Sequence, residues 1–294
     1  MITYRKIFYI ISGSLFAISM LAFVVWGLKP AIDFTGGSLL EVEYVEQKPD
    51  INTVRERVNN LNFGNVSIQP IGDNGFLVRL RDISEEEHAD LLLALHPVSS
   101  LLVEKRFDSI GPVIGKELTR KAWLAIIFVI LMIVLFIAVT FRKVSRPVSS
   151  WKYGVVAIVA LIHDVGLPVG VFSALGQFYN VEVDILFVTA LLTILGFSVH
   201  DTIVVFDRIR ENLRKGAGSF EDTVERSLKQ VSGRSIKTSL AILIVLVSLF
   251  VFGGETTKYF TLTLILGIVF GTYSSLFLAS PLLVTWHKYK EKKA

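Results

Sequence analysis

The chain has 294 residues, of which 52% are hydrophobic and 19% charged, with a formal net charge of +4 and no cysteine. With a mean hydropathy of +0.58 it is too apolar for a water-soluble domain of this length, which excludes a single soluble globule. The absence of cysteine excludes disulfides, thiolate metal sites and cysteine nucleophiles, so any domain outside a membrane must be held by its own core.

Six apolar runs are long enough to cross a hydrocarbon core of about 30 Å as helices. The runs cover residues 7–27, 122–141, 153–176, 185–206, 238–254 and 259–286. The first run is too long for the hydrophobic region of a signal peptide, and no A-x-A-like cleavage site follows it. The sequence therefore predicts an α-helical polytopic membrane protein with six transmembrane helices, the last five forming a membrane bundle over residues 122–286.

Basic residues flank these runs mainly on one side. They precede the first run, fill the loop 142–152 and the loop 207–237, and dominate the tail 287–294, whereas the two short turns on the opposite side carry only Lys258. Lys and Arg accumulate on the cytoplasmic side of a membrane, so we expect both termini in the cytoplasm. The same clusters favour contacts with membrane lipids over nucleic-acid binding, because no aromatic residues are interleaved with them.

This topology leaves one large outer segment, residues 28–121. Alternating apolar residues predict strands over 38–45, 65–71, 76–81 and 100–107, and helical spacing predicts helices over 50–61 and 84–95. Ser84 and Glu87 have the spacing of a capping box at the start of the second helix. The order β-α-β-β-α-β is that of a ferredoxin-like module, so we expect a small α+β periplasmic domain between the first two spans.

Two pairs of ionisable residues lie within the apolar runs. His163-Asp164 is near the middle of the third run, and His200-Asp201 is toward the inner end of the fourth. Ionisable side chains inside a bilayer cost several kcal/mol and usually mark a pathway or a partner. We interpret Asp201 as the main candidate for a proton carrier, with His163 and Asp164 as residues that help in proton coupling. The alternative is that each carboxylate only fixes helix packing through hydrogen bonds.

A cation is needed to set the pKa of such a carboxylate. Arg234, at the start of the fifth run, is the candidate, because the inner ends of two consecutive antiparallel spans are adjacent. A plain cytoplasmic anchor is the alternative role for Arg234. Asp201 and Arg208 lie on one face of the fourth span. We expect this face to carry charge from the apolar interior to the stretch that contains Asp207 and Arg208.

Three further segments have recognisable patterns. Residues 219–231 combine a capping box with an apolar stripe, which predicts an amphipathic helix on the inner membrane surface. Gly267 and Gly271 form a GxxxG spacing that permits close helix approach, although one such spacing is a weak signal. Pro168 follows His163-Asp164 and predicts a bend in the third span.

Enzyme signatures are absent from the sequence. It contains no phosphate-binding loop of the Walker type, no His-Glu-x-x-His, no Gly-x-Ser-x-Gly and no GxGxxG after a strand. The pair Gly36-Gly37 precedes a strand and is better explained as a tight turn. We therefore expect no enzymatic activity, no metal and no organic cofactor, with protons as the coupling ion.

Several motifs occur together and in a characteristic order. They are Asp33-Phe34-Thr35-Gly36-Gly37, Gly111-Pro112-x-x-Gly115, His163-Asp164, the stretch from Ser198 through Asp201, Asp207 and Arg208 to Asn212, the stretch from Arg234 to Leu240, and Gly271 to Ser275. In this order they resemble the SecF family, the smaller membrane subunit of the SecD–SecF accessory complex of bacterial protein export. Two positions depart from the family pattern, since His200 and Lys237 stand where Asn is common.

The resemblance implies a half transporter of the RND type in the bacterial cytoplasmic (inner) membrane. It implies a heterodimer with SecD, work beside the SecYEG channel with YajC and YidC as further partners, and proton-driven movement of periplasmic domains that hold an unfolded polypeptide. The intramembrane acid of the family falls on Asp201, and the arginine associated with it falls on Arg234. Two other functions stay open from the sequence: an autonomous small-solute efflux carrier, and a structural assembly factor that does not pump.

Overall fold

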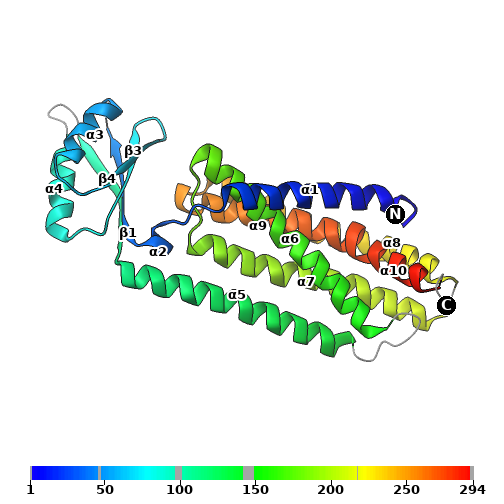
Figure 1. The fold of residues 1–294 in the computed structure, drawn as a ribbon. Helices are drawn as coiled ribbons and strands as arrows, with labels where there is room; N and C mark the ends of the chain where they lie inside the picture. Colours follow the sequence, from blue (N-terminus) through cyan, green and yellow to red (C-terminus); the bar gives the residue numbers. More distant parts are fainter. Residues whose placement is uncertain (1, 46–47, 97–100, 142–148, 217, 292–294) are drawn as a thin grey trace. The chain divides into compact units, whose positions relative to one another are not determined.

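The computed structural model describes residues 2–291 except 46–47, 97–100, 142–148 and 217 (Figure 1). The basic loop between the second and third spans and the last three residues of the basic tail therefore lie outside the described residues. The chain divides into two compact units. One unit, the bundle, contains Met1–Lys29 and Leu124–Ala294, and the other, the sheet unit, is Pro30–Trp123.

Six helices in the described part of the chain are long and apolar enough to cross a membrane, which confirms the predicted number. The first five are α1 (Arg5–Trp26), α5 (Pro112–Phe141), α6 (Ser150–Tyr179), α7 (Ile185–Arg214) and α8 (Phe220–Phe252). The sixth consists of α9 (Glu255–Ser274), a π-helical turn over Ser275–Ala279, and α10 (Ser280–Glu291). A one-turn 3-10 helix, Ile2–Tyr4, precedes α1.

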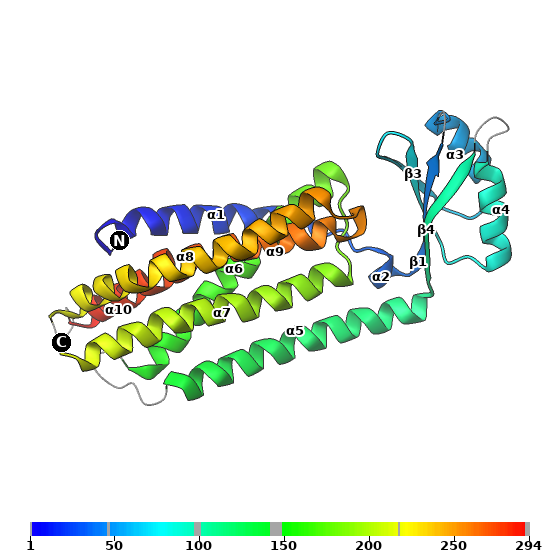
Figure 2. The same ribbon diagram turned by 180° about the vertical axis from the view of Figure 1, so that it is seen from behind.

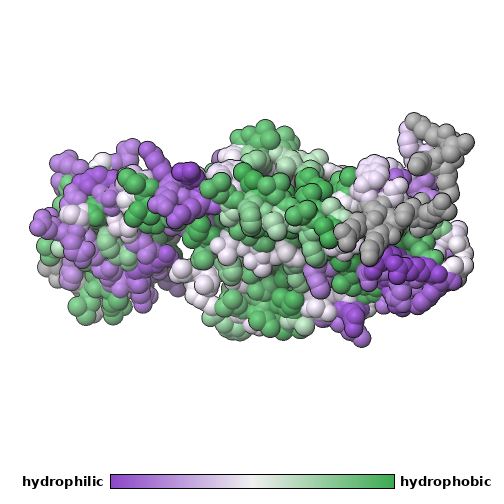
Figure 3. All heavy atoms as spheres, turned by 90° about the horizontal axis from the view of Figure 1, so that it is seen from below, coloured by the Kyte–Doolittle hydropathy of each residue, from purple (hydrophilic) through white to green (hydrophobic). Residues whose placement is uncertain are grey.

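The helices of the bundle differ in how much of their surface other helices cover. About half of the residues in α6, α7 and the last span are buried, whereas α1, α5 and α8 are mostly exposed along their apolar stretches. α5 packs on the others through a stripe of Val129, Ile133 and Ile137. The exposed surface forms the apolar band of Figure 3, and hydrophilic residues gather at the end of the bundle where both termini lie (Figures 1 and 2).

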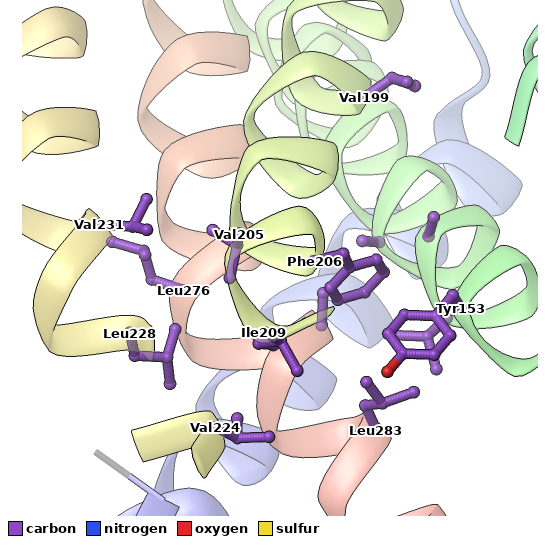
Figure 4. Packing of buried hydrophobic residues seen from close by; sticks show 14 of the residues in the cluster. Tyr153, Val199, Val205, Phe206, Ile209, Val224, Leu228, Val231, Leu276 and Leu283 are labelled. Carbon is purple, nitrogen blue, oxygen red and sulfur yellow. The ribbon is translucent and has the colours of Figure 1, made fainter. Parts of the chain in front are cut away.

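One prediction about the first part of α8 was wrong. The segment expected to lie on the membrane surface is instead the first part of α8, which continues without a break into the fifth span. Its apolar stripe of Val224, Leu228 and Val231 is buried in the same cluster as Ile209 of α7 and Leu276 (Figure 4). The apolar face is thus satisfied by protein, so it does not need the bilayer surface.

Ion pairs join three helix ends at this place. Glu221, in the first turn of α8, accepts a hydrogen bond of 2.8 Å from Arg5 of α1 and forms an ion pair with Lys288 of α10. The backbone N–H of Ile2 donates to Glu225 at 2.8 Å. The two ends of the chain therefore meet at the start of α8.

The described residues of the sheet unit form four strands, three helices and the first part of α5. α2 (Ile32–Thr35) comes first, and the remaining elements are β1 (Gly37–Tyr44), α3 (Ile51–Asn59), β2 (Ser67–Ile71), β3 (Gly75–Leu80), α4 (Glu85–Leu95) and β4 (Leu102–Ile110). The strand order is β2-β3-β1-β4 and every neighbouring pair is antiparallel. From β1 onward, the predicted order β-α-β-β-α-β is confirmed, and so is the capping box of Ser84 and Glu87.

Large apolar side chains fill the core of the sheet unit. Alternate residues of β1 and β3, such as Leu40, Val42 and Phe76, point toward the helices and are almost completely buried. Tyr44 lies in the same core, where its hydroxyl donates to the carbonyl of Leu95 at 2.9 Å. Burial raises the pKa of Tyr44 to about 12, so this hydroxyl stays a donor at any physiological pH.

Candidate functional site

A carboxylate in the middle of the bundle joins three helices. Asp164 of α6 is 0% exposed. It accepts hydrogen bonds from Ser198 of α7 at 2.5 Å and from Ser274 of α9 at 2.6 Å, both at Oδ2. Its other oxygen, Oδ1, lies 2.9 Å from Nδ1 of His163. The structure therefore brings Asp164 together with partners from α7 and α9, two of the helices packed beside α6.

Small residues make room for this cluster. A Cβ atom on Gly271 would stand 3.4 Å from Cβ of Ser198 and 3.7 Å from Oδ2 of Asp164. One turn outward, a Cβ on Gly267 would come within 2.1 Å of Cγ1 of Ile194. The GxxxG spacing thus lies on the face of α9 that contacts α7. A side chain at Gly267 would therefore force α9 and α7 apart or displace Ile194, whereas Gly271 leaves just enough room for a Cβ beside Asp164.

His163 is the second ionisable residue of this cluster. Its ring is 5% exposed and stacks on Phe16 of α1, with ring centroids 6.2 Å apart and an interplanar angle of 22°. Its Nδ1 faces Asp164, and its Nε2 is buried without a hydrogen-bond partner among the described residues. A buried ring nitrogen without a partner is uncommon in proteins.

Asp201 occupies a different environment on α7. Its side chain is also buried, at 6% exposure, and it hydrogen-bonds to Thr272 of α9. The hydroxyl of Thr272 is 2.7 Å from that of Ser239, which extends the contact to α8. Oδ2 of Asp201, however, has no hydrogen-bond partner within the described part of the chain. Of the two intramembrane carboxylates, only Asp164 has both oxygens engaged.

The predicted pairing of Asp201 with Arg234 is absent from this conformation. No hydrogen bond or ion pair between the two residues occurs in the described structure, and Arg234 is exposed on α8. The first residue of α8 to contact the Asp201 network is Ser239, which is buried more than one turn further along the helix. Antiparallel neighbours do adjoin here, as expected, but the guanidinium lies on another face of α8. His200 and Lys237 are exposed as well.

Hydroxyl groups were missed by the sequence analysis as site residues. Besides the serines on Asp164 and the Thr272–Ser239 pair, Thr202 of α7 lies 3.0 Å from Ser275 in the π-helical turn. Serines and threonines on one face of an otherwise apolar helix are a signal for such contacts, but the signal is too common to select these residues. A π-helical turn inside a helix is itself frequent at functional sites.

Asp207 and Arg208 lie in the C-terminal part of α7, away from both carboxylates. Asp207 forms an ion pair with Arg210, whereas Arg208 contacts Glu211 at 2.5 Å and donates to Gln230 of α8 at 2.7 Å. The contact of Arg208 with Gln230 joins the C-terminal part of α7 to the N-terminal part of α8. The structure gives these two residues positions in a helix-joining network.

The remaining motif residues meet at the base of the sheet unit. Gly36 and Gly37 have φ values of +75° and +126°, which L residues with a side chain rarely adopt. A Cβ on Gly115 would lie 2.8 Å from the backbone nitrogen of Gly36, and one on Gly36 would lie 2.9 Å from Cα of Pro112. Two backbones therefore touch directly.

Neighbouring residues reinforce this contact. Thr119 donates to the carbonyl of Phe34 at 3.3 Å, and Gly111 stands next to Asp82, which accepts from Ser109 at 2.7 Å. Asp33 lies in the first turn of α2. The segments by which the chain enters and leaves the sheet unit are thus locked together, so Gly36-Gly37 does more than turn the chain.

The same motifs decide the family. A family model described as "Protein export membrane protein SecD/SecF, C-terminal" matches residues 94–289, and one described as "SecD/SecF GG Motif" matches residues 22–48. The protein translocase subunit SecF of Thermobaculum terrenum is 42% identical over 97% of this chain and 93% of its own length. The chain belongs to the SecF family. SecF of Anaerolinea thermophila is 38% identical over 96% of this chain and 92% of its own length.

A solved structure resembles this SecF family member along almost its whole length. The crystal structure of SecDF, a translocon-associated membrane protein from Thermus thermophilus, matches with a TM-score of 0.83 and 31% identity. The match covers 98% of this chain but only 38% of the SecDF chain. The bundle and sheet unit described above therefore correspond to a part of that larger protein.

Proposed function

We propose that this chain is a subunit of the Sec protein-export machinery in the bacterial inner membrane, coupled to the proton-motive force. It pairs with a SecD partner and works beside the SecYEG channel, with YajC and YidC as further neighbours. Both termini lie in the cytoplasm, and the sheet unit is a ferredoxin-like periplasmic domain that contacts an emerging unfolded polypeptide. The names of the relatives and the distribution of basic residues support these assignments.

A single observation carries the coupling mechanism. Oδ2 of Asp201 is a buried carboxyl oxygen with no hydrogen-bond partner among the described residues, on one of the membrane-spanning helices. Leaving such an oxygen unpaired costs about 1–3 kcal/mol or more when it is charged. Binding a proton removes the charge, so the two protonation states favour different surroundings for this side chain. The proposal therefore assigns to Asp201 the conversion of proton binding into helix movement.

The neighbours of Asp201 indicate which helices would move. Thr272 and Ser239 link the carboxylate to α9 and α8, so a change at Asp201 reaches both helices. Arg234 stays in the proposal as the cation that a second conformation brings toward the ionised carboxylate, because it lies on α8 close to Ser239 in sequence. The chain performs no chemical reaction of its own in this mechanism, and it needs no metal or organic cofactor.

The exposed apolar faces of α1, α5 and α8 support a partner in the membrane. Side chains such as Phe252, which is 88% exposed, are compatible with lipid or with other helices. The SecDF match extends well beyond this chain, which favours a second membrane half as the occupant of part of this surface. An autonomous efflux carrier would need to form that second half from another copy.

Replacement of Asp201 tests the coupling. We expect Asp201→Asn, in the complex with SecD in inverted vesicles, to lose at least about tenfold of the translocation rate that depends on the proton gradient. Asp207→Asn is the matched control, because Asp207 lies on the same helix but outside the apolar interior. Precursor translocation is measured with and without an uncoupler. Gradient stimulation that persists in Asp201→Asn would overturn the mechanism.

A further inference from the structure

The His163–Asp164 couple has features of a site in its own right. We propose that it is a second proton-binding site, in which Nε2 of His163 takes up and releases the proton while Asp164 positions the ring. This inference rests on the proposed proton coupling and adds to it a site that is separate from Asp201. The contacts of the two residues, not their position in a motif, lead to this assignment.

Asp164 is arranged to hold an imidazole in one orientation. Ser198 and Ser274 donate to its Oδ2 from two other helices, which fixes the carboxylate plane, and Oδ1 is left to face Nδ1 of His163 at 2.9 Å. A carboxylate beside one ring nitrogen keeps the proton on that nitrogen. Any further proton on the ring must then be bound at Nε2, its other nitrogen.

Nε2 is the atom that lacks a partner. It is buried and unpaired within the described structure, although His163 packs closely on all sides. Phe16 covers the ring but offers neither a donor nor an acceptor. A proton on Nε2 converts a couple with one net negative charge into a neutral ion pair, which is favourable in an apolar interior. The proton comes from water on one side of the membrane and leaves to water on the other, so no other reactant is needed.

Few other ionisable groups belong to the helices around His163. The apolar part of α1 contributes only Tyr9, and α9 contributes Glu255 and Lys258 in its first turn as well as Tyr259 and Tyr273. α7 contributes His200, which is exposed, and Asp201, one residue before the Thr202–Ser275 contact. Asp164 is thus the only acid hydrogen-bonded to His163 among the described residues. The charge of the couple depends mainly on the protons that its own two side chains hold.

The charge of this couple affects the contact between α6 and α1. A Cβ on Gly166 of α6 would lie 2.5 Å from Cε2 of Phe16, so α1 and α6 touch at the turn that carries His163. An imidazolium ring attracts the face of an aromatic ring more strongly than a neutral imidazole does. Proton uptake therefore strengthens the contact between α6 and α1, whereas Asp201 acts on α8 and α9.

Nitrogen NMR of the intact chain tests the site directly. In the complex with SecD, with ¹⁵N-labelled histidine, we expect Nε2 of one buried imidazole to occur both with and without a proton while Nδ1 stays protonated. Its signal is assigned by its loss in His163→Gln. A ring that keeps one protonation state from pH 5 to 9 would overturn the inference. A purely structural role for His163 predicts that second result.

The pH profile of translocation gives an independent measurement. We expect His163→Gln, which retains a donor for Asp164 but cannot bind a proton, to lose the pH-dependent limb in this range and about tenfold of the gradient-driven rate. His96→Gln, at an exposed position of the sheet unit, is the matched control. An unchanged limb in His163→Gln would overturn the inference even if Asp201→Asn abolishes coupling. A parent complex that ignores the gradient would overturn the proposed function, while the imidazole titration still decides this site.

Discussion

The sheet unit buries its large apolar side chains, whereas the bundle exposes many of them. In the sheet unit such side chains lie inside, where Leu40, Val42 and Phe76 are almost completely buried. In the bundle many of them lie outside, as Val24 and Phe252 do, and the interior contains glycines, serines and two carboxylates. Water drives the first arrangement. Lipid gives apolar side chains no reason to leave the surface, so bundle helices associate through close packing and hydrogen bonds.

This difference has a consequence for mutations. Truncating a side chain in the core of the sheet unit removes hydrophobic burial and lowers stability. Truncating a side chain on the surface of the bundle changes stability little. Adding volume should have the reverse order of effects, because glycine positions set the distance between bundle helices. Each unit therefore has its own most sensitive kind of substitution.

The largest effect is expected for Phe76→Ala in the sheet unit. Phe76 is 1% exposed and packs edge-to-face on Tyr44, with ring centroids 5.9 Å apart. Truncating a buried phenylalanine costs about 3–5 kcal/mol. We expect amide hydrogen exchange in the sheet unit of the intact chain to accelerate by at least a hundredfold, with little change in the bundle.

The neighbouring residue is the control for this substitution. Leu77 follows Phe76 in β3 and points to the other face of the sheet, where it is only half-buried. Leu77→Ala should therefore accelerate exchange much less than Phe76→Ala. Equal effects of the two substitutions would mean that both faces of the sheet are covered, which contradicts a one-sided core.

The second largest effect is expected for Gly170→Ala in the bundle. A Cβ on Gly170 would lie 2.4 Å from Cα of Ser19 and 2.5 Å from its carbonyl oxygen, so α1 and α6 must separate. Overpacking of this kind costs about 1–3 kcal/mol or more. We expect the unfolding temperature in detergent to fall by roughly 5–10 °C. Gly196→Ala should leave it unchanged, because no atom lies within 4 Å of the added Cβ.

Much of this fold could be predicted from the sequence. Runs without charge define a membrane helix by length alone, and the alternation of β1 and the capping box at Ser84 are local patterns, so the six spans and the order of strands and helices along the chain were predicted correctly. The packing of residues 219–231 could not be predicted from a local pattern. Their apolar stripe is explained equally well by a bilayer surface or by α7, and only the packing of Val224 and Leu228 decides between them.

The candidate site was less predictable than the fold. Asp164 and Asp201 stand out in the sequence because a carboxylate in an apolar run is rare, and both are buried. Their partners are serines and threonines from helices far away in the chain, and hydroxyl residues are too common for the sequence to select Ser274 or Thr272. The face on which a long side chain such as Arg234 lies depends on helix rotation, which no spacing rule determines.

The smallest effect is expected from a buried hydroxyl in the bundle. Thr202 contacts Ser275 at 3.0 Å, but the hydroxyl of Ser275 also donates to the carbonyl of Gly271 at 2.8 Å and keeps that bond when Thr202 is replaced. Hydrogen bonds between membrane helices contribute about 0.6 kcal/mol on average. We therefore expect Thr202→Val, which preserves volume, to lower the unfolding temperature in detergent by only about 1–3 °C.

Ser248→Ala is the control for this last substitution, because the Ser248 hydroxyl bonds only within α8, to the carbonyl of Ile244. If Thr202→Val destabilised the bundle as strongly as Gly170→Ala, hydroxyl pairs would hold these helices together as much as close packing does. The interior of the bundle would then be a cooperative polar network, in which a change at one carboxylate is felt at the other. A small effect instead leaves the two carboxylates as separate sites that act on different helices.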